Sequence, residues 1–248
     1  MATNKETIAV WFSNGAASAV AAKLIVEKYL DTHEILIVNN PILEEHEDNL
    51  RFKRDVEKWI NHPIISVVNS KFPSGSIVDV FDKIKWVSGV GGASCTLNLK
   101  KEARYQFELS HKIDWHVLGF TKEEQHRHDR FVTGERANVI PVLIDAGLTK
   151  YDCFDILHKA GIKRPAIYEM GFPNANCIGC VKSSSPTYWN LVRKNFPDVF
   201  EQRAEQTRRL NCKLIKYKGE RIFLDELSLK AKGRKIPTWE CGLFCDTE

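Results

Sequence analysis

Four cysteines at short spacings are the residues of this chain best suited to chemistry. Cys177 and Cys180 form a C-x-x-C pair in a segment rich in Asn, Gly and Pro. A tight turn there lets two thiolates bind one metal ion, or form a redox dithiol. Cys241 and Cys245 form a C-x-x-x-C pair, and the two pairs together are compatible with a four-thiolate zinc site. Because the chain has 7 cysteines, an odd number, metal binding or thiol chemistry is favoured over complete disulfide pairing, with idle surface thiols as the alternative.

A second candidate site follows the first apolar run of the sequence. Small residues placed directly before a helix let backbone N–H groups approach an anion, and the helix N-terminus adds about half a positive charge. No Walker lysine is present, so the Walker-type phosphate loop is excluded. The pattern predicts a phosphate or sulfate site, with an ordinary tight turn as the alternative. The residues concerned are Ser13, Asn14, Gly15, Ala16, Ala17 and Ser18.

Four further residues are candidates for nucleotide binding. Asn39 and Asn40 end the second apolar run and can hydrogen-bond an adenine or ribose, or form an Asx turn before Pro41. Lys100 follows a glycine-rich stretch and is a candidate second anion contact, with a solvated charge as the alternative. Gly119 lies at the end of a later buried run, where ligands of parallel sheets bind.

Alternating apolar runs and helix-period segments predict the elements that position these residues. Such β-α-β alternation implies an α/β fold with a parallel twisted sheet flanked by helices and a cysteine-bearing C-terminal tail. We expect residues 1–165 to form the nucleotide-binding domain and 166–248 to pack on it as a cysteine-containing region. Strands are expected at residues 8–12, 34–38, 64–68 and 115–120, a short edge-like element at 139–142, and helices at 16–28, 44–60, 149–160 and 185–210.

Composition narrows the function classes. The net charge of +4 is mildly basic and suits an anionic ligand without requiring the long basic stripe of a dedicated nucleic-acid binder, so charge alone decides little. No apolar run approaches the roughly 20 residues of a membrane span. The first residues also lack the apolar stretch of a signal peptide. These features predict a soluble, cytoplasmic protein that does not interact with membranes.

Four segments carry a resemblance to a known family. Residues 12–18 resemble the PP-loop, usually SGGxDS, of ATP pyrophosphatases and sulfonucleotide reductases, and depart from it at Asn14 and Ala17. Residues 167–173, continued by 177–180, are similar to the LYxxGYxSIGCxxCT segment of the reductases. Residues 240–243 resemble their ECGLH signature, and residues 94–96 with Lys100 resemble the paired-cysteine segment of iron-sulfur adenylyl-sulfate reductases. The chain thus resembles the phosphoadenylyl-sulfate (PAPS) reductase group of the PP-loop, or adenine nucleotide alpha hydrolase-like, superfamily.

The resemblance implies roles for individual residues. Cys241 corresponds to the catalytic thiol, with Phe244 where the family has histidine. Cys95, Cys177 and Cys180 correspond to cluster ligands, and Cys245 supplies the ligand that Ser94 cannot. The implied ligands are an adenine nucleotide (PAPS or ATP), an iron-sulfur cluster or zinc, and a reduced thiol donor. The alternatives are ATP-dependent sulfur insertion into nucleic acid and a nucleotide- or nucleic-acid-binding module without turnover; the altered loop favours the reductase over the ATP-cleaving enzymes.

Overall fold

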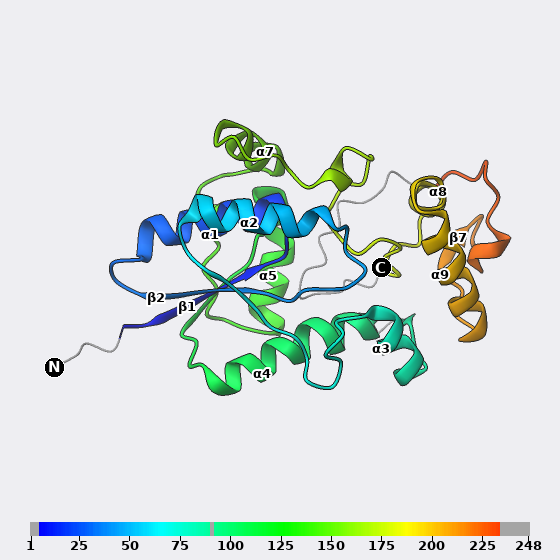
Figure 1. Cartoon of the computed structure of the whole chain (residues 1–248), viewed down its shortest axis with the longest axis horizontal. Coiled ribbons are helices and arrows are strands. Elements are labelled where there is room, and N and C mark those ends of the chain that lie inside the picture. Colours follow the sequence, from blue (N-terminus) through cyan, green and yellow to red (C-terminus); the bar gives the residue numbers. More distant parts are fainter. Residues whose placement is uncertain (1–4, 90–91, 234–248) are drawn as a thin grey trace. The chain divides into compact units, whose positions relative to one another are not determined.

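A computed structural model describes residues 5–89 and 92–233 of the chain (Figure 1). These residues form two compact units, and each unit is made of segments that are not consecutive in the sequence. The first contains residues 5–40, 47–67 and 104–165, and the second contains 41–46, 68–89, 92–103 and 166–233. The region after residue 165 is therefore grouped with two segments that precede it in the sequence. Its expected packing on the nucleotide-binding domain stays a prediction.

The first unit is built on a four-stranded parallel sheet with strand order β3-β2-β1-β6. The expected α/β class, a parallel sheet flanked by helices, is confirmed. Each predicted strand is present, with ends that differ by a few residues. The strands are β1 (Thr7–Phe12), β2 (Glu34–Asn39), β3 (Ile64–Ser66) and β6 (Trp115–Val117), and the connecting helices are α1 (Ala16–Tyr29) and α2 (Asp48–Ile60).

The central strand β1 is buried along its whole length, which explains its unbroken apolar sequence. Ile8, Val10 and Phe12 belong to the core that includes α1, α2 and α7 (Lys150–Lys159). Trp11 points to the other face, where its ring lies 6.2 Å from the ring of Phe107 in α4 (Glu102–Ser110). Figure 1 shows α1 and α2 over one face of the sheet and α4 over the other. Helices on both faces hold the carboxyl ends of the strands in fixed positions.

The remaining helices of the first unit are short. Helix α7 confirms the helix expected at residues 149–160. The edge-like element expected at residues 139–142 is a single bridge from Val139 to His116, and helix α6 begins at Val142. The other helices of the first unit are a 3-10 helix (Lys122–Glu124), α5 (Gln125–Gly134) and α6 (Val142–Asp145).

The second unit contains helices, turns and two small hairpins. The single helix expected at residues 185–210 is two helices, because Pro197 has no N–H and its ring blocks continuation of the preceding helix. No helix in the described part of the chain is long and apolar enough to cross a membrane. The elements are α3 (Ile77–Ile84), the pair β4 (Ser88–Gly89) and β5 (Gly92–Ala93), a π-helix (Thr96–Lys101), 3-10 helices (Ala166–Tyr168 and Leu224–Glu226), α8 (Pro186–Asn195), α9 (Pro197–Arg209), and the pair β7 (Ile215–Tyr217) and β8 (Glu220–Ile222).

One buried histidine in the sheet gives the first unit a pH dependence. His116 is 1% exposed, and its Nδ1 accepts a hydrogen bond of 3.2 Å from the Trp11 indole. Burial, together with the charges of Arg136 and Arg104, lowers the pKa of His116 from 6.5 to about 3. The unfolded chain therefore takes up a proton near pH 6.5, which the folded chain does not take up until about pH 3.

Stability should consequently be complete above pH 6.5 and fall as the pH decreases toward 3. Between pH 7 and pH 5 the expected loss from this residue is about 2 kcal/mol, since one pKa unit corresponds to about 1.4 kcal/mol. Urea unfolding of the wild type and of His116→Gln at both pH values measures it. The glutamine can still accept from Trp11, so an equal pH dependence in both proteins would contradict the assignment.

Candidate functional site

The loop between β1 and α1 keeps its backbone geometry despite its unusual sequence. Asn14 is buried and has φ of +59°, in the left-handed region. Glycine adopts this region freely, and asparagine is among the few other residues that enter it routinely. The departure from the PP-loop pattern at Asn14 therefore preserves the turn. Ser13 is half-buried, and Gly15, Ala16, Ala17 and Ser18 are buried.

Hydrogen bonds within the loop fix the start of α1. The Ser18 hydroxyl accepts from the Ser13 N–H at 3.1 Å and donates to the Gly15 carbonyl at 2.9 Å. Gly15 is the N-cap residue, no described side chain caps the helix, and no acidic residue lies in its first turn. The partial positive charge of this N-terminus is therefore not neutralised by its own helix, which suits an anion.

Gly119 lies against this helix N-terminus. Gly119 follows β6. Strand β6 lies next to β1 on the side opposite β2, so the strands that follow β1 in the sequence are found on both sides of it in the sheet. A Cβ on Gly119 would lie 2.8 Å from the backbone N of Ser18 and 3.0 Å from the carbonyl carbon of Ala17. Only a glycine permits this close approach. Ligands of open α/β sheets bind at such a point, and Gly119 and the loop were both predicted as nucleotide-binding from the sequence.

Asn39 and Asn40 connect the ends of adjacent strands. The Asn39 carboxamide donates to the carbonyl of Phe12 at 2.9 Å, and the Asn40 carboxamide donates to the carbonyl of Val67 at 2.9 Å. Both side chains thus hold the carboxyl edge of the sheet together. Their contact with an adenine or ribose stays a prediction.

Three of the predicted metal ligands line one pocket of the second unit. Cys95, Cys177 and Cys180 lie on its wall together with Lys100. Cys95 immediately precedes the π-helix Thr96–Lys101, an element that occurs frequently at functional sites. Lys100, predicted as a nucleotide contact, thus lies beside these cysteines in the second unit. Its contact with a nucleotide stays a prediction.

The C-x-x-C segment adopts the tight turn expected from its sequence. Gly179 has φ of +70°, and a Cβ there would lie 3.2 Å from Cγ1 of Val199 in α9. The N–H of Cys180 donates to the Tyr188 hydroxyl at 2.7 Å, and the N–H of Ile178 donates to the carbonyl of Glu44 at 2.8 Å. These bonds hold the buried Cys177 and Cys180 in place.

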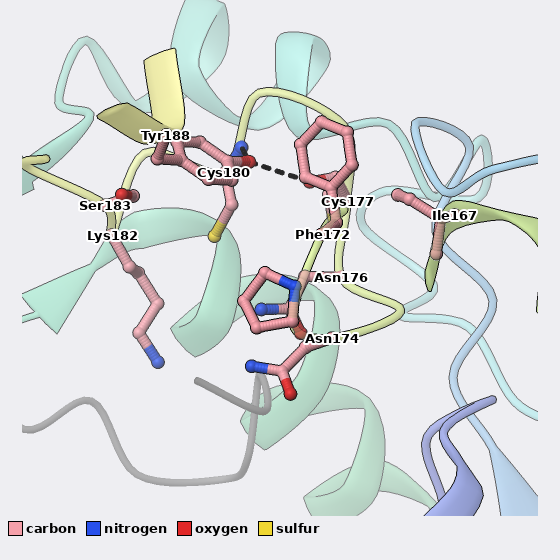
Figure 2. Close-up of a pocket in the computed structure, with 10 residues that line it drawn as sticks. Ile167, Phe172, Asn174, Asn176, Cys177, Cys180, Lys182, Ser183 and Tyr188 are labelled. Carbon is pink, nitrogen blue, oxygen red and sulfur yellow. Dashed lines mark hydrogen bonds between the residues drawn. The ribbon is translucent and has the colours of Figure 1, made fainter. Parts of the chain in front are cut away.

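A second pocket lies beside the same two cysteines. Figure 2 shows the sulfur of Cys180 directed into it, with the Tyr188 ring on one side and the Asn174 carboxamide on the other. The pocket combines aromatic, amide and cationic groups next to the thiols. Its lining also includes Ile167, Phe172, Pro173, Asn176, Lys182 and Ser183.

The other cysteines differ in environment. Cys153 is fully buried in the first unit's core, as expected. Cys212 is half-buried, and burial raises the pKa of its thiol. Ser94, which stands where the family has a cysteine, donates its hydroxyl to the carbonyl of Trp86 at 2.6 Å. The predicted catalytic Cys241 and the predicted ligand Cys245 lie outside the described residues.

The cysteine pocket fits a thiolate-bound metal by the chemistry of its donors. Soft thiolates favour zinc and iron-sulfur clusters. Within residues 5–89 and 92–233, however, no group of three or more His, Cys, Asp or Glu side chains is arranged to hold a metal ion. Three cysteines line one pocket without a closed ligand set among them, so the assignment of a metal stays a prediction.

Sequence reasoning missed Arg203, a buried residue of α9. Its position could have been inferred from helical spacing, because Phe200, Arg203, Ala204 and Thr207 share the buried stripe of α9. An arginine in such a stripe is unusual, since arginine is almost never fully buried unless it is paired.

Comparison with known proteins supports the fold. No family model and no curated protein matches the chain. The U34-tRNA thiolase NcsA from Methanococcus maripaludis, solved with its 4Fe-4S cluster, is similar over 84% of this chain and 74% of its own, with 14% identity and a TM-score of 0.50. The PAPS reductase from Candida auris, solved as a phosphate complex, is similar over 68% of this chain and 78% of its own, with 10% identity and a TM-score of 0.46.

The strand order and the similarity to the thiolase show an α/β fold built on a parallel sheet flanked by helices. The fold that the resemblance implied is confirmed, because the chain shares it with this thiolase.

Proposed function

We propose that the chain binds an adenine nucleotide at the β1–α1 loop and reduces a sulfonucleotide such as PAPS through the thiolate of Cys241. The observation that carries the nucleotide assignment is the packing of Gly119 on the first turn of α1, at 2.8 Å from a Gly119 Cβ to the N of Ser18. This packing places the N-terminus of α1, which no described side chain caps, at the carboxyl ends of β1 and β6. The strand order changes direction at this point of the sheet, where ligands of open α/β sheets bind. We place the protein in the cytoplasm, where thiols are kept reduced.

In the proposed reaction the Cys241 thiolate attacks the sulfate sulfur of PAPS. The bond from that sulfur to the phosphate oxygen breaks, and adenosine 3′,5′-bisphosphate leaves with the electron pair. The product on the protein is a thiosulfonate, Cys–S–SO3. A reduced thiol donor then attacks the cysteine sulfur, sulfite leaves, and the two sulfurs form a disulfide. The sulfate sulfur is reduced by two electrons, and two thiols are oxidised.

We further propose that Cys95, Cys177 and Cys180, with Cys245, hold a metal centre, either an iron-sulfur cluster or zinc. Their presence on one pocket wall supports this assignment. A metal bound there would supply structural stability to the second unit.

A second candidate function is ATP-dependent insertion of sulfur into a nucleic acid. The pocket in Figure 2 favours it, because Phe172 and Tyr188 rings with the carboxamides of Asn174 and Asn176 are groups that stack on and hydrogen-bond a base. Lys182 supplies a cation for the backbone phosphate. The similarity to a tRNA thiolase is compatible with this candidate.

Mass spectrometry of the intact chain after incubation with PAPS tests the leading proposal. We expect the mass of one SO3 group on the wild type, removal of this mass by a dithiol, and no adduct on Cys241→Ser. The matched control Cys212→Ser changes a half-buried thiol of the second unit and should still form the adduct. An unmodified wild type that instead releases pyrophosphate from ATP when RNA is added would replace reduction by sulfur insertion.

A further inference from the structure

One face of helix α8 carries a row of polar side chains that bind the backbone of a later segment, residues 227–233, which we call the stem. Thr187, Asn190 and Arg193 are spaced by three residues, so they share one side of the helix. The carboxamide nitrogen of Asn190 lies 3.0 to 3.2 Å from three carbonyl oxygens of the stem. Arg193 donates to the first carbonyl of the stem at 3.0 Å, and the Thr187 hydroxyl accepts from its last N–H at 3.0 Å. Because these bonds are made to the backbone, they fix the path of the stem whatever side chains it carries.

The stem ends in a close contact with the N-terminus of α8. A Cβ on Gly233 would lie 2.6 Å from Cδ of Pro186 and 3.0 Å from Oγ of Ser185. A larger residue at this position would therefore push the stem away from the helix. Gly233 is the last described residue, and Cys241 and Cys245 follow it in the sequence.

The buried side of α8 holds the C-x-x-C turn. The Tyr188 hydroxyl accepts from the N–H of Cys180 at 2.7 Å, and the Trp189 indole donates to the carbonyl of Ser183 at 2.7 Å. Tyr188 also lines the pocket into which the sulfur of Cys180 is directed (Figure 2). One helix of the second unit thus contacts both the stem and the turn, and sets where the stem ends relative to the pocket.

The stem also sets the length of chain between α8 and the C-terminal cysteines. The eight residues from Gly233 to Cys241 span at most about 29 Å, even when fully extended. If the chain left α8 after Leu227, fourteen residues would lie between the held backbone and Cys241. The effective concentration of tethered groups falls roughly as the −3/2 power of the tether length, so the stem raises it by about twofold to threefold.

We propose that α8 positions the C-terminal cysteines: its polar face holds the stem, and the stem tethers Cys241 and Cys245 beside the pocket of Cys177 and Cys180. Thr187, Asn190 and Gly233 are then positioning residues, which act through the length and the starting point of the tether. The chemical role of Cys241 rests on the function proposed above, whereas the tether rests on the described contacts and on the order of the chain.

Disulfide formation between Cys180 and Cys241 in the full-length chain tests the proposal. Cys177→Ser and Cys245→Ser are introduced together, so that each cysteine pair keeps one thiol. Oxidised glutathione accepts the two electrons of the reaction, and two molecules of reduced glutathione are released. The equilibrium ratio of disulfide to thiols, read by peptide mass spectrometry, gives the effective concentration of the two sulfurs. We expect a value of about a millimolar, as short tethers give.

Release of the stem should lower this effective concentration. In the same background, Thr187→Val together with Asn190→Leu should reduce it by about twofold to threefold, because the tether becomes longer. Asn195→Leu is the matched control. It removes a carboxamide of the same helix that donates to the carbonyl of Leu191 at 2.9 Å, and it should leave the value unchanged.

A second variant lengthens the tether without touching α8. Six Gly and Ser residues inserted after Lys235 leave the described contacts of the stem in place and should produce the same fall, even if the released variant does not fold. Wild-type effective concentration in the insertion variant, or in a folded released variant, overturns the role of the stem. Absence of the disulfide at every glutathione ratio overturns it as well. Failure of PAPS to modify Cys241 overturns the proposed reaction instead, and leaves the tether supported wherever the disulfide equilibrium shifts as expected.

Discussion

The Gly119→Val variant is expected to lose adenine-nucleotide affinity by about tenfold to a hundredfold. A hydrogen bond to a charged group contributes about 1.5–3 kcal/mol, and the displaced helix N-terminus would lose one or more of them. The displacement follows from geometry, because the first added carbon would lie 2.8 Å from the N of Ser18 and 3.0 Å from the Cα of Ser18. Overpacking of this kind should also lower the free energy of unfolding by about 1–3 kcal/mol.

Isothermal titration calorimetry with ATP and with adenosine 3′,5′-bisphosphate measures the effect on binding. Gly147→Ala is the matched control: Gly147 has φ of +68° and no atom within 4 Å of an added Cβ. That variant should lose stability through backbone strain and keep its nucleotide affinity. If Gly119→Val binds both nucleotides as tightly as the wild type does, the β1–α1 loop is not the nucleotide site.

Cys177→Ser and Cys180→Ser are each expected to release the metal and to lower the melting temperature. Structural zinc contributes roughly 10–16 kcal/mol of apparent binding free energy in small domains, so loss of one of four thiolates should weaken binding by about a hundredfold or more. Both side chains are buried on the wall of the pocket that Cys95 shares, and serine is a poor ligand for the same metals. Metal analysis after anaerobic purification, together with thermal unfolding, measures both effects.

Cys153→Ser provides the control for the cost of a buried hydroxyl. Cys153 is fully buried in the core of the first unit, so this variant should lower stability while retaining full metal content. Full occupancy in the Cys177 and Cys180 variants would instead identify the C-x-x-C as a redox pair or an idle thiol pair. Thiol titration under oxidising and reducing conditions would then distinguish these two.

Local sequence was sufficient where an element depends on its own residues. The apolar run of β1 predicted a strand buried on both faces, and the structure confirms this because nothing polar interrupts it between Thr7 and Phe12. The small residues after β1 predicted the turn into α1, and the segment around the C-x-x-C predicted a tight turn, in which Gly179 has a positive φ. The helix predicted across residues 185–210 was wrong as one element, although Pro197 itself marks the break.

Only the tertiary structure decided which distant residues meet. The sequence places Gly119 at the end of a buried run, but only the pairing of β6 with β1 brings it against Ser18, about a hundred residues away. Cys95 joins Cys177 and Cys180 because residues 68–103 fold with the segment after residue 165, which the hydrophobic pattern of either segment does not specify. Hydrophobic periodicity records which face of an element is buried, whereas these contacts depend on which elements cover that face.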